Sequence, residues 1–180
     1  MFGRHVEEKD LSTPSFYVTL VLHDFLLHNC TPDSGASHNL MSLSVMKPLG
    51  LQITKTYKDL YSFHSKKLKC LGMIKDLVVN LAQILVKGVV MDIVVADIPA
   101  RFGMLLSRSW GIKLGGSIKL DLTYATLPMF SGEECRLCKE SRFVKTITRV
   151  DNSNNSPIHG QEKYISCLLM EMDDKIMEET

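Results

Sequence analysis

Two apolar runs rich in β-branched residues, at positions 73–86 and 89–96, most constrain what this chain can fold into. Lys87 and Gly88 separate the two runs. β-branched side chains pack well on a pleated sheet and lose rotamer freedom in a helix. Both runs are therefore predicted to be core strands.

Two further strands and a hairpin are predicted in the first part of the chain. Residues 16–22 are rich in Phe, Tyr, Val and Thr, and residues 26–30 form a second apolar run. His23 and Asp24 lie between these runs, at the position of a turn. Residues 51–72 hold two short extended runs around a polar stretch, which is typical of a hairpin and its tip.

A short helix is predicted to follow residue 39. Leu40, Leu43 and Met46 recur at helical spacing, and Pro48 and Gly50 end the pattern. The sequence therefore favours an all-β fold that also contains short helices.

The segment after residue 97 is predicted to mix short elements. Residues 98–101 indicate a turn, 104–106 a buried strand, and 107–112 one helical turn. Residues 117–123 alternate apolar and polar side chains, which predicts a half-exposed strand.

Composition divides the chain into three parts. Residues 1–14 are expected to be a solvated lead-in, residues 15–130 the folded domain, and residues 131–180 a linker and tail. Residues 151–157 have the low complexity of a linker. Beyond them an apolar stripe recurs at helical spacing and predicts an amphipathic helix, with Ile165, Leu168, Leu169, Met172 and Ile176 as its members.

The overall composition excludes several classes of protein. With 180 residues, 45% hydrophobic and 23% charged, the chain has the length and composition of one globular domain. A net charge of +1 provides no strong positive potential that would attract nucleic acid. Lys87, Asp92 and Asp97 interrupt the longest apolar stretches, so no segment is expected to span a bilayer. The five irregularly spaced cysteines indicate reduced thiols, so we expect an intracellular, cytoplasmic location.

The motif with the clearest chemistry is Asp33-Ser34-Gly35, which follows the predicted strand at 26–30. Taken alone it is weak, because most such tripeptides are surface loops. The order of the surrounding elements gives it weight: a strand, the motif, a short helix, a polar-tipped hairpin, two core strands, and then the apolar run at 104–106.

Four segments carry a resemblance to a known family: DSGASHNLM at 33–41, YSFHSKKLKCLGMIKDLVV at 61–79, MDIVVADIP at 91–99 and FGMLLSRSW at 102–110. They resemble the retropepsins, the aspartic proteases of retroviruses and long-terminal-repeat retrotransposons. The match is closest to the protease segment of plant Ty3/gypsy-type polyproteins and covers about residues 16–130. The resemblance implies an all-β acid-protease half-barrel.

The resemblance implies roles for the residues of the active-site loop. Asp33 matches the catalytic aspartate, and Ser34 matches the hydroxyl residue that supports the two active-site loops. Gly35 matches the glycine that turns the backbone tightly beside the carboxylate.

The resemblance also places supporting residues and a flap. Leu105 and Leu106 match the apolar pair behind the loop, and Arg108 matches a structural arginine. Residues 59–72 match the flap that closes over substrate, with Tyr61, Ser62, Phe63, His64 and Ser65 as its substrate-binding residues.

The chemistry of this family requires a second copy of the chain. Aspartic proteolysis uses two carboxylates that share one proton, and this chain has one Asp-Ser-Gly and no second such motif. The resemblance therefore implies a homodimer that hydrolyses polypeptides, such as the polyprotein containing it. No metal, organic cofactor, nucleic acid or membrane partner is expected.

Two departures from the family pattern support an alternative function. Pro32 replaces an apolar strand former and is expected to remove a hydrogen-bond donor from the strand. Ser107 replaces a glycine and is expected to crowd the active-site loop. The alternative is a degenerate or domesticated retropepsin-fold module that dimerises or binds peptides. A third alternative is a retropepsin-like shuttle of the ubiquitin pathway.

A few other residues invite functional interpretations. Cys135 and Cys138, with His159 and Cys167, suggest zinc, but their spacing fits no common zinc motif, so thiols in a tail are favoured. His38 is interpreted as a surface or helix-capping residue. Asn39 is expected to cap the short helix, and Trp110 to fill the core.

Overall fold

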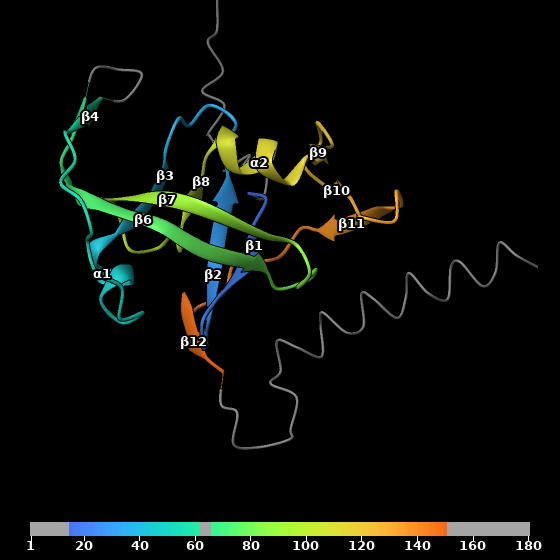
Figure 1. Cartoon of the computed structure of the whole chain (residues 1–180), viewed down its shortest axis with the longest axis horizontal. Coiled ribbons are helices and arrows are strands. Elements are labelled where there is room, and N and C mark those ends of the chain that lie inside the picture. Colours follow the sequence, from blue (N-terminus) through green and yellow to red (C-terminus); the bar gives the residue numbers. More distant parts are fainter. Residues whose placement is uncertain (1–14, 62–65, 151–180) are drawn as a thin grey trace, which may run out of the picture.

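The structure is a computed structural model that describes residues 15–61 and 66–150. Seven strands form one sheet in the order β1-β6-β7-β3-β8-β2-β12, and an additional pairing of β1 with β2 closes the sheet on itself (Figure 1). These strands are β1 (Val18–Leu22), β2 (Phe25–Pro32), β3 (Asn39–Ser42), β6 (Cys70–Leu81), β7 (Gly88–Ala96), β8 (Leu105–Leu106) and β12 (Ile147–Arg149).

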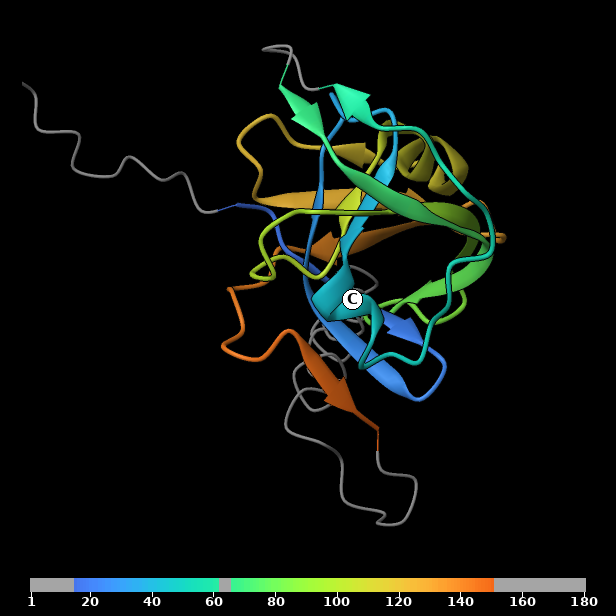
Figure 2. The same ribbon diagram turned by 90° about the vertical axis from the view of Figure 1, so that its left-hand side faces the viewer.

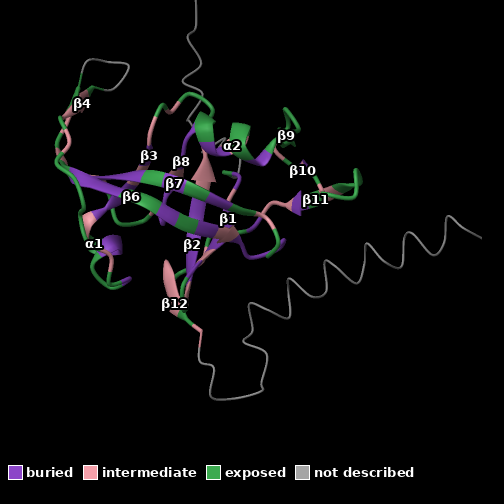
Figure 3. Cartoon of the chain, viewed as in Figure 1, coloured by how far each residue is buried: buried purple, intermediate pink, exposed green. Residues whose placement is uncertain are grey.

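The two β-branched runs form the strands β6 and β7, as predicted, although β6 begins at Cys70 and ends at Leu81. The structure shows that these two strands pair antiparallel. Their side chains alternate between the core and the outside. Val79 and Met91 are buried, whereas Val78 and Val90 are exposed. Figure 3 shows the buried residues concentrated in the strands of the closed sheet.

Two short helices, a small sheet and a hairpin complete the described fold. The helices are α1 (Leu43–Met46) and α2 (Arg108–Leu114). The small sheet contains β9 (Ser117–Ile118), β10 (Tyr124–Pro128) and β11 (Glu134–Cys138). The hairpin pairs β4 (Leu60–Tyr61) with β5 (Lys67–Leu68), and Figure 2 shows it standing away from the closed sheet.

The predicted helix at 40–46 begins later than its apolar pattern. Leu40 lies in β3, and the helix begins at Leu43, where the Ser42 hydroxyl accepts a hydrogen bond of 3.2 Å from the Val45 N–H. Ser42 is therefore the helix cap, and the prediction that Asn39 caps this helix is wrong.

The predicted strand at 117–123 is largely a turn. Only its first two residues form a strand, and the Leu122 N–H then donates to the Lys119 carbonyl. The Asp121 carboxylate accepts hydrogen bonds from both the N–H and the hydroxyl of Thr123, which fixes the turn. Leu120 is fully exposed, so the alternating pattern does not correspond to a buried face.

The folded unit extends well beyond residue 130. β11 pairs with β10, and its Leu137 is buried in the core. β12 pairs with β2, with Ile147 opposite Leu27. The predicted boundary at 130 is therefore wrong, because residues 131–150 complete both sheets. The lead-in at 1–14, and the linker and helix predicted beyond residue 150, lie outside the described residues.

A buried polar network fastens residues 139–149, here called the C-terminal strap, to the β1–β2 hairpin. The Thr19 hydroxyl donates to the Glu140 carboxylate at 2.8 Å and lies 2.9 Å from His28 Nδ1. The single hydroxyl proton goes to Glu140, so Nδ1 carries the ring proton and Nε2 accepts from the Thr148 hydroxyl at 3.0 Å. Burial lowers the pKa of His28 to about 4, so this neutral form is the stable one. Phe143 stacks on the His28 ring.

Truncation tests whether the strap belongs to the fold. We expect residues 1–150 to keep a cooperative thermal transition, and residues 1–130 to lose it. Removing 131–150 takes away β11 and β12, removes the hydrogen bonds that Glu140 and Thr148 make to Thr19 and His28, and uncovers core surface. Calorimetry of both truncations checks this. An unchanged melting temperature for residues 1–130 would show that residues 131–150 are not needed by the fold. Loss of the transition in residues 1–150 would show that the folded unit extends beyond residue 150.

Candidate active site

The loop at residues 33–38 joins β2 to β3 across the end of β8. β8 pairs in parallel with β2, with Pro32 opposite Leu106, and antiparallel with β3, with Leu40 opposite Leu105. The short strand β8 therefore lies between the two strands that the loop connects. This arrangement fixes both ends of the loop against one buried strand, because Leu106 is fully buried.

Pro32 removes no hydrogen bond from this arrangement. The Thr31 N–H donates to the Met104 carbonyl at 3.0 Å, and the Asp33 N–H donates to the Leu106 carbonyl at 2.8 Å. In a parallel ladder only every second residue of a strand bonds a given neighbouring strand. Thr31 and Asp33 are the residues of β2 and its end that bond β8, so the backbone nitrogen of Pro32 between them faces away from β8. The expectation that Pro32 costs β2 a ladder donor is wrong.

The Asp33 carboxylate is exposed and oriented by its own loop. The Gly35 N–H donates to Asp33 Oδ1 at 2.9 Å, and the Ala36 N–H donates to the Asp33 carbonyl at 3.0 Å. A Cβ on Gly35 would lie 3.2 Å from Asp33 Oδ1, which is tighter than ordinary van der Waals contact. The loop thus holds the carboxylate in one direction and leaves it accessible to solvent and to a ligand.

Asn39 is a buried polar residue that ties three elements together. Its Oδ1 accepts from the Ser107 N–H at 2.8 Å, and its Nδ2 donates to the Asp92 carbonyl at 2.9 Å. It therefore connects β3 to β7 and to the start of α2. Asn39 shares the inward face of β3 with Met41, so its place in the alternating pattern is the sequence signal that could have revealed it.

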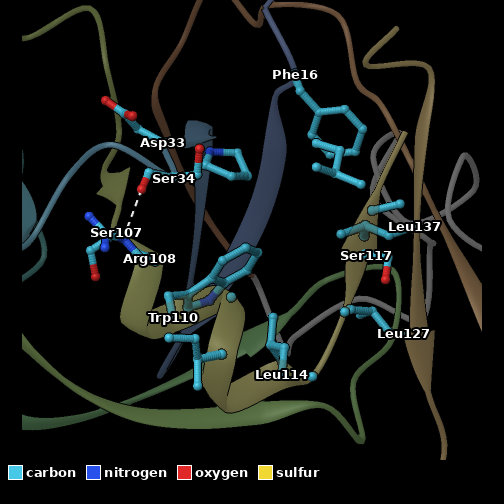
Figure 4. A pocket seen from close by; sticks show the side chains of 17 residues that line it. Phe16, Asp33, Ser34, Ser107, Arg108, Trp110, Leu114, Ser117, Leu127 and Leu137 are labelled. Carbon is cyan, nitrogen blue, oxygen red and sulfur yellow. Dashed lines mark hydrogen bonds between the residues drawn. The ribbon is translucent and has the colours of Figure 1, made fainter. Parts of the chain in front are cut away.

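Arg108 fastens the loop from the other side. Its Nε–H donates to the Ser34 carbonyl at 3.0 Å, which Figure 4 marks as a dashed line. Its backbone N–H donates to the Ala36 carbonyl at 3.0 Å. Both hydrogen bonds go to backbone oxygens, so Arg108 fixes the shape of the loop. The predicted role of the Ser34 hydroxyl, support of a second loop, stays a prediction.

Ser107 fits its position without glycine. Its φ of −75° is ordinary for any residue, and its hydroxyl lies 2.8 Å from that of Ser109. The side chain is buried and hydrogen-bonded just before α2 begins. The expectation that Ser107 crowds the loop is therefore wrong.

An apolar hollow of about 430 Å³ opens beside the loop. Trp110 and Leu114 of α2 line one side, and Leu127 and Leu137 of the small sheet line the other (Figure 4). Asp33 lies at the rim of the hollow and is the only carboxylate among the described residues that line it. Trp110 is also part of the buried core, as predicted.

A hydrogen-bonded chain connects the loop at 33–38 to the segment that leads into the β4–β5 hairpin, which is the predicted flap. His38 Nε2 lies 2.7 Å from the Tyr57 hydroxyl, and His38 Nδ1 lies 2.7 Å from the Ser37 hydroxyl. Tyr57 precedes β4, so His38 links the loop to the arm of the hairpin and caps no helix. Tyr61 ends β4 and is exposed, whereas residues 62–65 of the predicted flap lie outside the described residues.

Within residues 15–61 and 66–150, no group of three or more His, Cys, Asp or Glu side chains is placed to hold a metal ion. Cys135 and Cys138 are three positions apart on β11, so their side chains point to opposite faces of the strand. His159 and Cys167 lie outside the described residues. In the same part of the chain, no helix is long and apolar enough to cross a membrane.

Comparison with known proteins shows likeness in structure only. No family model matches the sequence, and no curated protein matches it significantly. The retroviral protease-like domain of Ddi1 from Leishmania major has a TM-score of 0.54 at 15% identity, over 73% of this chain and 98% of that domain. EIAV protease complexed with the inhibitor HBY-793 has a TM-score of 0.44 at 14% identity, over 66% and 100% of the two chains.

A retropepsin-like aspartic protease from Rickettsia conorii has a TM-score of 0.44 at 20% identity, over 59% of this chain and 86% of that one. The likeness to the Ddi1 domain, together with the closed sheet, shows that this chain has the retropepsin-like acid protease fold. At 15% identity the likeness establishes the fold alone.

Replacing Asn39 tests how the loop is held. We expect Asn39→Ala to lower the free energy of unfolding by about 1–3 kcal/mol, because the Ser107 N–H and the Asp92 carbonyl lose their partners. Asn80→Ala is the matched control, because Asn80 makes one exposed hydrogen bond, to the Leu85 carbonyl. Urea unfolding measures both variants, and equal losses would contradict the role assigned to Asn39.

Proposed function

We propose that this protein is an aspartic endopeptidase that acts as a homodimer, with Asp33 of each copy as its catalytic residue. The observation that carries the proposal is the placement of Asp33. Its exposed carboxylate is oriented by the Gly35 N–H at 2.9 Å, on a loop fixed by β8, at the rim of an apolar hollow. This arrangement suits a carboxylate that must meet a second one in a defined direction.

The proposed mechanism uses two carboxylates that share one proton. Like charges so close cannot both ionise, so one Asp33 stays protonated while the other is charged. The charged carboxylate takes a proton from water, and the protonated one donates a hydrogen bond to the scissile carbonyl.

The apolar surface around the hollow supports self-association. Ile112 and Ile118 lie at its lining and are exposed, next to the buried Trp110 and Leu114. A second copy that covered this surface across a two-fold axis would bury apolar area and bring the two rims, with both Asp33 residues, together. Homodimerisation and catalysis would then depend on the same face.

The proposed substrate is an extended polypeptide held beneath the flap by strand-like pairing. The four segments that resemble plant Ty3/gypsy-type proteases suggest the origin of the chain in a retrotransposon polyprotein, which would be its natural substrate, inside the cell. The alternative of a non-catalytic peptide-binding module relied on Pro32 and Ser107. Both residues are accommodated in the loop without a lost donor or a clash, which favours the peptidase.

Asp33→Asn tests the mechanism on an unstructured peptide. We expect the variant to keep its melting temperature and lose cleavage, whereas Asp24→Asn, in an exposed turn, should keep both.

Wild-type activity per chain should fall on dilution, because the dimer dissociates. Mixing equal amounts of wild type and Asp33→Asn should lower activity per wild-type chain to about half, since half of those chains enter mixed dimers. Cleavage by Asp33→Asn would refute the mechanism.

A further inference from the structure

The two arms of the flap hairpin, residues 54–61 and 66–75, concentrate positive charge and are here called the basic arms. They hold six lysines and one acid, Asp59, although the net charge of the whole chain is only +1. All six lysine side chains are exposed, and the lysines are Lys55, Lys58, Lys66, Lys67, Lys69 and Lys75. The charge of the molecule is therefore distributed very unevenly.

The fold brings the lysines of both arms together. Lys55 forms an antiparallel bridge with Met73, and Tyr61 pairs with Lys67 at the other end of the ribbon. The arms therefore run side by side along their length, and lysines far apart in sequence share one narrow ribbon. Because Tyr57 in the first arm bonds to His38 of the active-site loop, this ribbon begins beside the candidate active site.

Within the described residues, ion pairs neutralise some of these charges and not others. Lys67 pairs with Asp59 at 2.9 Å, and Lys75 pairs with Asp92 at 3.5 Å. Lys55, Lys58 and Lys69 form no ion pair with any described residue, so their charges are available to a ligand.

A cleft of about 460 Å³ continues the positive surface at the base of the arms. Lys47 and Lys69 line it together with Ser44 and with Ser42, whose hydroxyl already caps α1, and Asp97 is its one acid. Leu43, Leu71 and Ile98 supply an apolar part of the lining. Cations and hydroxyls beside apolar surface suit a peptide that carries both carboxylates and aliphatic side chains.

The chain itself contains a peptide of that composition. Residues 151–180 hold seven acids and two lysines, a formal charge of −5 (2 − 7), and Leu168, Leu169 and Met170 lie among them. The acids are Asp151, Glu162, Glu171, Asp173, Asp174, Glu178 and Glu179. Thirty extended residues span roughly 100 Å, which is enough to reach the basic arms of the same chain or of a second copy.

We propose that the basic arms and the adjoining cleft select acidic peptides, and that the ligand they take in this protein is its own segment 162–179. This inference rests on the proposed function, because it names the class of substrate that lies beneath the flap. Single exposed ion pairs contribute little, but several lysines on one ribbon attract an acidic peptide together and raise its association rate. Binding should therefore weaken as salt is added.

A binding experiment tests the selection. The protein is the full chain carrying Asp33→Asn, with amides replacing the acids at 171, 173, 174, 178 and 179 so that its own segment does not compete. The probe is a fluorescent peptide of residues 160–179, measured by anisotropy. We expect Lys55→Glu, Lys58→Glu and Lys69→Glu together to weaken binding about tenfold. The matched control, Lys119→Glu, Arg142→Glu and Lys145→Glu, makes the same charge change at exposed positions outside the arms and should leave binding within twofold.

Two further probes test whether the basic arms prefer the acidic peptide to a neutral peptide and to nucleic acid. A peptide with amides in place of its acids should bind at least tenfold more weakly, and so should a twenty-residue oligothymidine. Equal weakening by both triple variants, or tight binding of the neutral peptide, would overturn the inference. Tighter binding of the oligothymidine would show instead that the arms recognise nucleic acid.

Cross-linking tests whether the chain's own segment is the occupant. In the full chain with Asp33→Asn, carbodiimide should join Lys55, Lys58 or Lys69 to acids between 171 and 179, and high salt should abolish these links. Links from these lysines only to acids outside residues 162–179 would refute that segment as the ligand. Since these tests use an inactive variant, intact binding without cleavage by wild type would refute the peptidase and leave the binding of acidic peptides by the basic arms standing, with the peptide as a ligand and not a substrate.

Discussion

The hydrogen bond from the Asp33 N–H to the Leu106 carbonyl, 2.8 Å long, is the interaction on which the candidate site depends. It exists because β8 lies between β2 and β3, so the loop that carries the carboxylate crosses the end of a buried strand. Asn39 and Arg108 then fix the remaining sides of the loop. The position of one exposed carboxylate thus follows from the packing of a two-residue strand, and the proposed chemistry requires that fixed position.

The sequence predicted the parts of this structure that depend on local patterns. β6 and β7 were predicted because their residues are apolar and rich in β-branched side chains, and Asp33-Ser34-Gly35 is a compact motif after a strand. The parts that were missed depend on distant partners. Asn39 bonds residues 53 and 68 positions away, and Glu140 bonds Thr19 across 121 positions. Alternation along β3 could place Asn39 on the buried face, but it does not identify the partners of Asn39 or of Glu140. The three-residue strand β12 is too short to show a period.

The fold and the proposed chemistry favour different pH ranges. A dyad that shares one proton works under acidic conditions. The pKa of His28 is lowered from 6.5 to about 4 in the folded chain, so between these values the unfolded state binds more protons and stability falls as pH drops. The strap that His28 helps to hold is therefore weakened in the range that the dyad prefers. The working pH would be a compromise between the two.

The most direct test of the central claim is the distance between the two Asp33 carboxylates in a crystal structure of the self-associated chain. A dyad made by two copies of Asp33 requires a two-fold axis beside the apolar hollow and carboxylate oxygens within hydrogen-bonding distance, about 2.5–3.5 Å. A dimer whose Asp33 side chains lie on opposite faces, or are separated by more than roughly 10 Å, would contradict it, because two carboxylates so far apart cannot share a proton.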